Sequence, residues 1–112
     1  MRPDHFLPLT ETSFFILFSI VSTPKHGYAI IKDVERMSAS RVVLATGTLY
    51  SALRRMLEDG WIERMEEGSS NSDGRDRKLY RMTDEGRRVF NLETERLQAL
   101  VQLTSLRKAM DG

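Results

Sequence analysis

The residues of this chain that are best placed to do chemistry are cations in two short segments. Two adjacent arginines lie within an amphipathic segment, and three further cations lie close together beyond it. They are Arg54 and Arg55 in the first segment, and Arg75, Arg77 and Lys78 in the second. Guanidinium and ammonium groups neutralise phosphates, and arginine also forms paired hydrogen bonds with guanine edges. The two segments therefore predict a surface that binds nucleic acid.

Residues for catalysis or metal binding do not occur in the spacing that such sites need. The sequence has no cysteine, and its two histidines, His5 and His26, lie on different predicted elements without a second ligand at helical spacing. It also lacks a nucleophile elbow, a phosphate-binding loop and a carboxylate pair in an apolar setting. We therefore expect no enzyme, no metal and no cofactor, and we expect His26 to hydrogen-bond at the start of its helix. The lack of cysteine fits a reducing compartment.

The segment with the first two arginines has the pattern of a helix ended by glycine. Thr46 is a candidate N-cap, and the apolar residues Leu49, Leu53 and Met56 follow at helical spacing. Gly60 suits the left-handed residue that follows a helix C-terminus. The opposite face is small, hydroxylated and basic. It holds Gly47, Ser51, Arg54, Arg55 and Glu58, with Tyr50 on its flank.

Two short strands with a polar tip follow this helix. The segments 61–66 and 78–83 suit paired strands, with Tyr80 and Met82 on one face. The residues between them, 67–76, have no apolar side chain to bury, so we expect a mobile tip. A helix, a tight turn and a basic hairpin in immediate succession predict a winged helix-turn-helix.

One apolar helix and one amphipathic helix are predicted before the arginine-bearing helix. The first is expected to start after Thr10, its N-cap, and to end near Ser22. Over 14–21 it is apolar all round, a pattern that a helix tolerates only when several of its sides are covered. The second, over 26–38, would be the supporting helix of the helix-turn-helix. A turn follows it, and residues 42–44 suit a short edge strand.

The last segment is predicted to be one long helix with two apolar faces. Thr83 is a good N-cap, and the periodicity continues to about Met110, a length of about 40 Å at 1.5 Å per residue. Two apolar faces need two partners, so we expect the surface beyond the winged domain to pack against a second subunit. The expected fold is mostly α with a small β-hairpin. It comprises a winged helix-turn-helix domain over 1–83 and a C-terminal dimerisation helix over 84–112.

Composition places the chain among ordinary globular proteins of one domain. Its 112 residues include 17 Lys and Arg against 16 Asp and Glu, a net charge of +1, so nucleic-acid binding has to depend on where the charges lie. The longest apolar run, 14–21, is interrupted by Ser19 and is shorter than the roughly 20 residues of a membrane span. No basic segment precedes this run and no cleavage site follows it. We therefore expect no membrane span, no signal peptide and a cytoplasmic location.

Five segments of the sequence together resemble the PadR family of bacterial transcriptional regulators. They are LPLTE at 7–11, HGYAI at 26–30, GTLY at 47–50, LEDGWI at 57–62 and YRMTDEGR at 80–87. The resemblance covers nearly the whole chain in the family's order, and the combination of His-Gly-Tyr with Gly-Thr-Leu-Tyr is quite specific. The chain is similar to the small class, which has one helix after the wing.

This resemblance implies a homodimeric repressor that binds a near-palindromic double-stranded DNA operator near its own gene. The recognition helix would enter the major groove, and the wing would follow the backbone or the minor groove. By position, the residues expected to contact DNA are Tyr28, Thr48, Tyr50, Ser51, Arg54, Arg55, Arg75, Arg77 and Lys78. The first and last helices of each subunit would interlock. The dimer interface would then include Phe14, Phe15, Phe18, Leu97, Leu100, Leu103 and Leu106.

Three features depart from the family's usual pattern. Ser51 stands where many members have proline, and Asp76 stands where many have proline between two wing arginines, which weakens the positive field of the wing. The final helix has no tryptophan, whereas drug-sensing members use aromatic side chains of that helix to hold flat ligands. An aromatic sandwich is therefore not supported, and a small hydrophobic effector of another kind stays a candidate partner.

The same residues also have purely structural interpretations. Arg54 and Arg55 suit a solvated helix face, Tyr50 suits packing against the wing, and cations on an edge hairpin keep it soluble. Trp61 and the phenylalanines over 14–18 are expected in the core. A winged helix that serves only as a protein–protein adaptor is the alternative function, and salt-dependent DNA binding distinguishes the two.

Overall fold

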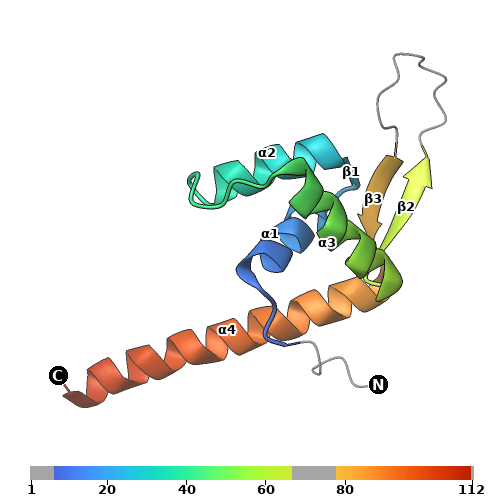
Figure 1. The fold of residues 1–112 in the computed structure, drawn as a ribbon. Coiled ribbons are helices and arrows are strands. Elements are labelled where there is room, and N and C mark those ends of the chain that lie inside the picture. Colours follow the sequence, from blue (N-terminus) through green and yellow to red (C-terminus); the bar gives the residue numbers. More distant parts are fainter. Residues whose placement is uncertain (1–6, 67–77, 112) are drawn as a thin grey trace.

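The computed structural model describes residues 7–66 and 78–111, which form a group of three helices, a small sheet and one long helix. In chain order the elements are α1 (Glu11–Ile20), β1 (Lys25–His26), α2 (Gly27–Met37), α3 (Thr46–Glu58), β2 (Ile62–Glu66), β3 (Lys78–Met82) and α4 (Asp84–Asp111). Figure 1 shows α1, α2 and α3 grouped beside the sheet, while α4 passes the group and continues well beyond it. The predicted winged helix-turn-helix with a long C-terminal helix is confirmed.

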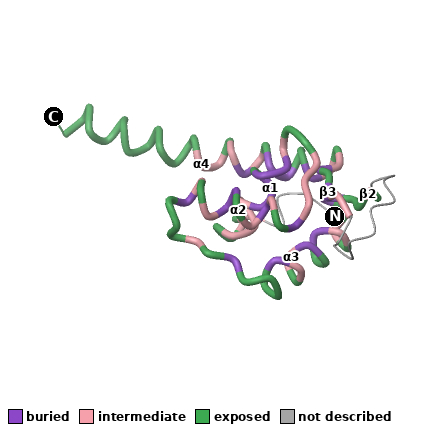
Figure 2. The backbone as a smooth tube through the Cα atoms, turned by 90° about the horizontal axis from the view of Figure 1, so that it is seen from above, coloured by how far each residue is buried: buried purple, intermediate pink, exposed green. Residues whose placement is uncertain are grey.

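The hydrophobic core lies where the three grouped helices meet the sheet and the first turns of α4. Figure 2 shows the buried positions concentrated there and absent from the far half of α4. The core side chains are Ile16, Leu17, Ile20, Ile30, Val34, Leu44, Leu49, Leu53, Met56, Trp61, Ile62, Tyr80, Met82, Val89 and Phe90. The all-round apolar character of α1 is explained by its place, since it packs against both α2 and α4.

The sheet has three antiparallel strands in the order β1-β3-β2. In the hairpin, Ile62 pairs with Met82, Arg64 with Tyr80, and Glu66 with Lys78. Since side chains alternate along a strand, these six residues share one face, and the buried Ile62, Tyr80 and Met82 identify it as the face toward the core.

The third strand is not the one that the sequence suggested. Residues 42–44 were expected to form an edge strand, but the edge of β3 is occupied by Lys25 and His26, which pair with Tyr80 and Leu79. Ser38 replaces the ladder for the 42–44 segment, because its Oγ accepts the Val42 N–H at 2.9 Å. The Ser38 side chain thereby offers the Val42 backbone a local alternative to a strand ladder.

The helix starts confirm one predicted N-cap and correct another. Thr10 caps α1, because its Oγ1 accepts the Ser13 N–H at 3.0 Å. Thr46 does not cap α3: it is already the first helical residue, and Ala45 holds the cap position without a side-chain hydrogen bond. The Ala45 carbonyl accepts the first helical bond from the Leu49 N–H at 2.9 Å, so α3 begins one residue earlier than the sequence indicated.

Helix α1 ends at Ile20, slightly before the expected Ser22, and Val21 is its C-cap. The Val21 carbonyl accepts a hydrogen bond at 2.9 Å from Nη2 of Arg87 in α4. An arginine from another helix therefore satisfies a carbonyl that the end of α1 leaves open.

The end of α3, the start of β2 and the start of α4 meet at Gly60 and Trp61. Gly60 has φ +80°, and the N–H groups of Gly60 and Trp61 bond to the carbonyls of Leu57 and Met56 at 3.2 and 3.0 Å, which is a Schellman ending. The Thr83 N–H in turn donates to the Trp61 carbonyl at 3.0 Å. We call this meeting point the Gly60–Trp61 corner.

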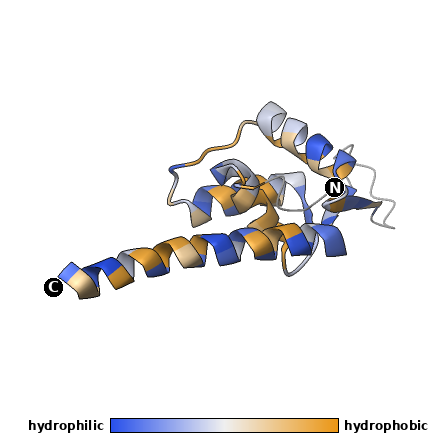
Figure 3. Ribbon diagram, turned by 90° about the horizontal axis from the view of Figure 1, so that it is seen from below, coloured by the Kyte–Doolittle hydropathy of each residue, from blue (hydrophilic) through white to orange (hydrophobic). Residues whose placement is uncertain are grey.

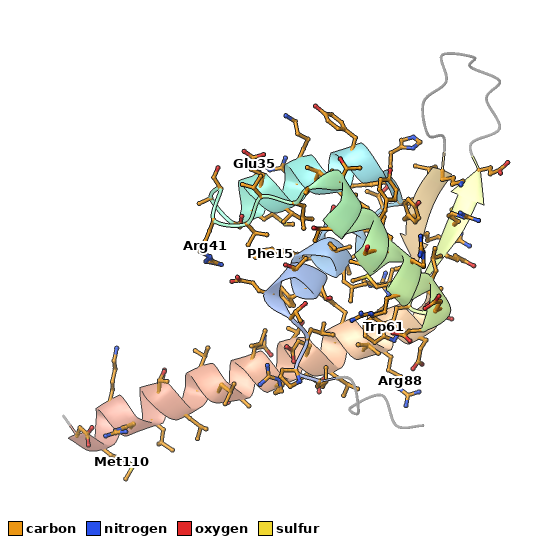
Figure 4. All side chains as sticks on the ribbon, viewed as in Figure 1. Phe15, Glu35, Arg41, Trp61, Arg88 and Met110 are labelled. Atoms are coloured by element: carbon orange, nitrogen blue, oxygen red, sulfur yellow. The ribbon has the colours of Figure 1, made fainter. Side chains whose placement is uncertain are left out.

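Helix α4 starts directly against that corner. Thr83 caps it as predicted, because its Oγ1 accepts the Gly86 N–H at 3.0 Å. A Cβ on Gly86 would lie only 1.9 Å from the Trp61 carbonyl oxygen, so only glycine allows the helix to approach this closely. Figure 4 shows Trp61 at the corner and Met110 at the opposite end of α4.

The two halves of α4 have different surroundings. Val89 and Phe90 are buried in the core, whereas five large apolar side chains from Leu100 onward are exposed to between 47% and 77%. These exposed residues are Leu100, Val101, Leu103, Leu106 and Met110. Figure 3 shows hydrophobic stretches continuing along the part of α4 that extends beyond the rest of the chain. In the described part of the chain, no helix is long and apolar enough to cross a membrane.

Candidate nucleic-acid interface

The exposed face of α3 carries the predicted contact residues of the recognition helix. Leu49, Leu53 and Met56 are buried, and the turn of the helix places hydroxyl and guanidinium groups opposite them. Thr48, Ser51, Arg54 and Arg55 are all exposed, as predicted for a face that meets DNA. The structure thus brings these four residues together on one side of a single helix.

The two arginines of this face point to different neighbours. Arg54 lines a groove of about 350 Å³ between α3 and the sheet. Arg55 and Ser51 line a second hollow of about 350 Å³ on the other side of α3, beside the chain that leads into α1. Ser51 thus lies between the two arginines on the helix surface, and the arginines flank it on opposite sides.

The groove beside Arg54 contains a cation that sequence analysis did not single out. Its lining residues are Tyr50, Leu53, Arg54, Leu57, Arg64, Lys78 and Tyr80. We call it the helix–wing groove. Arg64 is exposed. It lies two residues after the buried Ile62 and therefore on the same, core-facing side of β2. Strand alternation was the available signal, because a cation at a core-facing position is unusual.

Tyr50, on the flank of α3, lies between the start of α2 and the helix–wing groove. Its side chain is half-buried, and the position of a Cβ at Gly27 would be 2.5 Å from its hydroxyl oxygen. Tyr50 therefore contacts the start of α2 and also lines the helix–wing groove. Its place in the groove supports the structural interpretation, packing beside the wing, while its contact with DNA stays a prediction.

The other predicted contacts lie around this face or outside the described residues. Tyr28 is 70% exposed on α2, and Nζ of Lys32 lies 5.6 Å from the centre of its ring. Lys78 is half-buried at the start of β3. Arg75 and Arg77, together with the expected mobile tip over 67–76, fall outside the described residues.

His26 is bonded across the sheet rather than at the start of its own helix. It holds the N-cap position of α2 without a side-chain cap bond, and its Nδ1 lies 3.0 Å from the Lys78 carbonyl oxygen, to which it donates. The strand pairing beside it explains this orientation. Within the described ranges, no group of three or more His, Asp or Glu side chains is placed to hold a metal ion.

A buried aspartate joins α1, β1 and α2 behind the exposed face. Asp33 accepts hydrogen bonds from the Ser19 hydroxyl at 2.8 Å and from Arg36 at 2.9 Å, and it forms an ion pair with Lys25. Burial disfavours its charge, but the bonds from Lys25, Ser19 and Arg36 outweigh burial and hold the pKa of Asp33 below its usual value.

A buried glutamate performs a similar role on α4. Glu93 accepts a hydrogen bond from Nε of Arg96 at 2.6 Å and another from the Leu9 N–H at 3.1 Å. The bond from Arg96 lowers the pKa of Glu93 despite its burial, and the bond from Leu9 acts in the same direction. The segment before α1 is thereby fixed to α4.

The predicted dimer residues fall into two groups along the chain. Phe14 and Phe15 are half-buried and Phe18 is 45% exposed, so these rings are less covered than a core assignment implies. Phe90 of α4, which sequence analysis did not include, stacks on Phe14 with centroids 5.2 Å apart. The second group lies further along α4. Leu97 is half-buried there, and Leu100, Leu103 and Leu106 are exposed.

Comparison with protein families gives a match over most of the chain. A sequence model described as the transcriptional regulator PadR-like family matches residues 16–92 of the 112. Among curated proteins, none matches.

Solved structures share the fold. A PadR family transcription regulator from Clostridium difficile is 25% identical with a TM-score of 0.71, and the match covers 87% of this chain and 97% of that one. A PadR-like transcriptional regulator from Bacillus cereus is 24% identical with a TM-score of 0.68, covering 89% and 91%. Bacillus subtilis PadR in complex with operator DNA is 17% identical with a TM-score of 0.64, covering 93% of this chain and 65% of that one. The last two likenesses concern the fold alone.

Proposed function

Because this chain belongs to the PadR-like family of transcriptional regulators, we propose that it is a homodimeric repressor that binds an operator near its own gene. The family consists of DNA-binding transcriptional regulators and is without catalytic activity. The dimer, the operator and the direction of regulation are what we add to that assignment.

The observation that carries the proposal is the exposed face of α3 beside the wing. A recognition helix needs short polar and basic side chains that reach base edges, and Thr48, Ser51, Arg54 and Arg55 provide them. Tyr28 and Lys78 extend the surface onto α2 and β3. Bacillus subtilis PadR, which has the same fold, is known in complex with operator DNA.

The dimer is supported by the apolar side chains that α4 leaves exposed. Leu100, Leu103 and Leu106 are each about half exposed or more, and together with their neighbours they form a long apolar surface. Such a surface is typical of a helix that packs against a second subunit. We propose a functional division into a DNA-binding part over 1–83 and a dimerisation helix over 84–112. The first turns of α4 share the core of the first part.

A small hydrophobic effector would act where aromatic rings reach the surface. The rings of Phe14 and Phe90 each lie 5.9 Å from the ring of Phe18, which is partly exposed. In the proposed dimer this cluster lies next to the interlocking helices, so an apolar compound inserted there would change how the subunits pack. We propose release of DNA by this route.

The proposal is tested by titrating the protein on the DNA upstream of its own gene and on a scrambled duplex, at several salt concentrations. We expect tighter binding to the upstream DNA and a strong salt dependence of both affinities. Sedimentation at micromolar concentration should show a dimer. A chain that binds neither duplex would be the adaptor considered above, and a folded monomer would refute the interlocked helices.

A further inference from the structure

We propose that the helix–wing groove binds one phosphate of the DNA backbone and that Arg64 of β2 is its principal ligand. This inference rests on the proposed function, and it adds a contact residue to that same surface. Nothing in the sequence motifs assigns a role to Arg64. The role of Arg64 is instead indicated by its place in the fold, on the wall of a positively charged groove beside α3.

The alternation along β2 places Arg64 where an apolar residue would be expected. Ile62, Arg64 and Glu66 share the core-facing side of the strand, opposite Met82, Tyr80 and Lys78. Ile62, Tyr80 and Met82 are buried, whereas Arg64 is exposed. The core therefore ends at this level of the hairpin, and from here the same face of the sheet forms one wall of an open groove.

The groove is positively charged on both walls. Arg54 of α3 faces Arg64 and Lys78 of the sheet across about 350 Å³, and no carboxylate is among the lining residues. In the described part of the chain, neither Arg54 nor Arg64 forms an ion pair with a carboxylate. Like charges that line one groove raise each other's energy, and an anion between Arg54 and Arg64 would remove that cost.

On the other face of the same hairpin, an arginine is already paired with a carboxylate. There Arg81 forms an ion pair with Glu63, its direct partner across the strands. Among the described residues, Arg81 is thus neutralised by a carboxylate, whereas Arg64 is not. Two arginines of one hairpin therefore differ in whether they are available to an external anion.

The anion is a phosphodiester of the DNA rather than a free ion because of where the groove lies. Its walls are α3, which carries the proposed base-reading residues, and the hairpin that follows the backbone in a winged helix. A duplex seated on α3 brings its phosphates past the gap between helix and wing. Contacts of this kind fix the position of a protein on the duplex and carry no sequence information.

The test compares Arg64→Ala with Arg81→Ala, which removes the same charge from the other face of the same hairpin. Each variant is titrated on the upstream DNA and on the scrambled duplex at several salt concentrations. We expect Arg64→Ala to weaken binding to both duplexes by a similar factor, about tenfold or more at low salt. The slope of log affinity against log salt should decrease in magnitude by about 0.9. Arg64→Lys should keep the wild-type slope, and Arg81→Ala should keep both slope and affinity.

A second measurement identifies the phosphate. Methylphosphonate substitution neutralises one phosphate at a time along each strand of the upstream DNA. At one position, neutralisation should weaken binding by the wild-type protein but have little further effect on Arg64→Ala, since both changes remove the same contact. Unfolding temperatures measured for both variants check that the hairpin is intact.

Three outcomes would overturn the inference while leaving the proposed function standing. They are a wild-type salt slope for Arg64→Ala, an equal loss for Arg81→Ala, and no phosphate whose effect depends on Arg64. Inorganic phosphate that raises the unfolding temperature of the wild type, but not of Arg64→Ala, together with an unchanged slope, would make the groove a site for a free anion. Failure of the wild-type protein to bind DNA would instead refute the proposed function itself.

Discussion

The hydroxyl of Tyr50 and the backbone of Gly27 are in such close contact that a Cβ on Gly27 would lie 2.5 Å from the hydroxyl oxygen. Gly27 is the first residue of α2, and Tyr50 is on α3. The contact therefore sets the spacing between the supporting helix and the recognition helix. It brings the glycine of the His-Gly-Tyr segment against the last tyrosine of the Gly-Thr-Leu-Tyr segment.

The first prediction concerns this contact. Gly27→Ala should destabilise the protein by about 1–3 kcal/mol, because the new methyl group forces the Tyr50 side chain to move. Adding Tyr50→Phe removes the hydroxyl and should restore most of the loss. Gly47→Ala is the control, since a Cβ there meets nothing within 4 Å. Urea unfolding of the wild type and these three variants checks the prediction, and an equally large loss in Gly47→Ala would contradict it.

The second prediction concerns the dimer. Leu100→Glu or Leu103→Glu places a charge on the apolar surface of α4, at an expected cost of several kcal/mol in dimer stability when that surface is covered. Either variant should lose dimerisation and operator binding together. Gln102→Glu adds the same charge to an exposed polar position beside them and should remain dimeric. Sedimentation and DNA titration measure both properties, and a monomer that still binds the operator at full affinity would disprove the arrangement.

The third prediction separates base reading from phosphate binding. Arg54→Ala should bring operator affinity close to that for random DNA, because a good pair between arginine and guanine discriminates by about 1–3 kcal/mol. Arg77→Ala should weaken binding to both DNAs by a similar factor and reduce the salt slope by roughly one. Titrations on operator and scrambled duplexes give the specificity ratio. If Arg54→Ala keeps the wild-type ratio, α3 is not the sequence reader.

The fourth prediction concerns acid stability. The pKa values of Asp33 and Glu93 are both lowered in the folded chain, so their contribution is fully present above the usual carboxyl pKa of about 4. It is lost as the pH falls through the folded-state values. Asp33→Asn should lower the free energy of unfolding at pH 7 by about 2–4 kcal/mol and flatten its decline in acid. Glu95→Gln, at an exposed position of α4, should do neither. Urea unfolding from pH 2 to pH 7 provides the comparison.

The sequence was sufficient for features set by local pattern. Leu49, Leu53 and Met56 repeat at helical spacing and are all buried, and Gly60 ends α3 with a positive φ. Patterns of this kind depend on near neighbours, so they are visible in a single sequence. The two apolar faces of the last helix were also visible. Which part of these two faces is buried within this chain depends on where α1 packs against the helix, and the sequence of the helix alone does not reveal that.

Features that depend on distant pairing were missed. Lys25 and His26 form a strand too short to have a periodicity, and only the free edge of β3 makes them one. In the sequence, Arg64 is one charge among several in a polar strand. Its significance depends on its pairing with Tyr80 and on the approach of α3, neither of which is encoded in the residues around it.

The Gly60–Trp61 corner joins the end of α3, the proposed recognition helix, directly to the start of α4, the proposed dimerisation helix. The Thr83 N–H donates to the Trp61 carbonyl, and Gly86 fits against the same oxygen, so the start of α4 packs directly against the residues that end α3. In the proposed dimer, a change in the angle at which the two α4 helices cross would therefore turn both recognition helices by the same amount. Half-sites lie about 34–36 Å apart on one face of DNA, and such a turn would move the helices out of step with them. Regulation would then act through the crossing angle of the two α4 helices. This angle would decide whether the spacing of the two recognition helices fits the operator, without any change in the shape of either DNA-binding part.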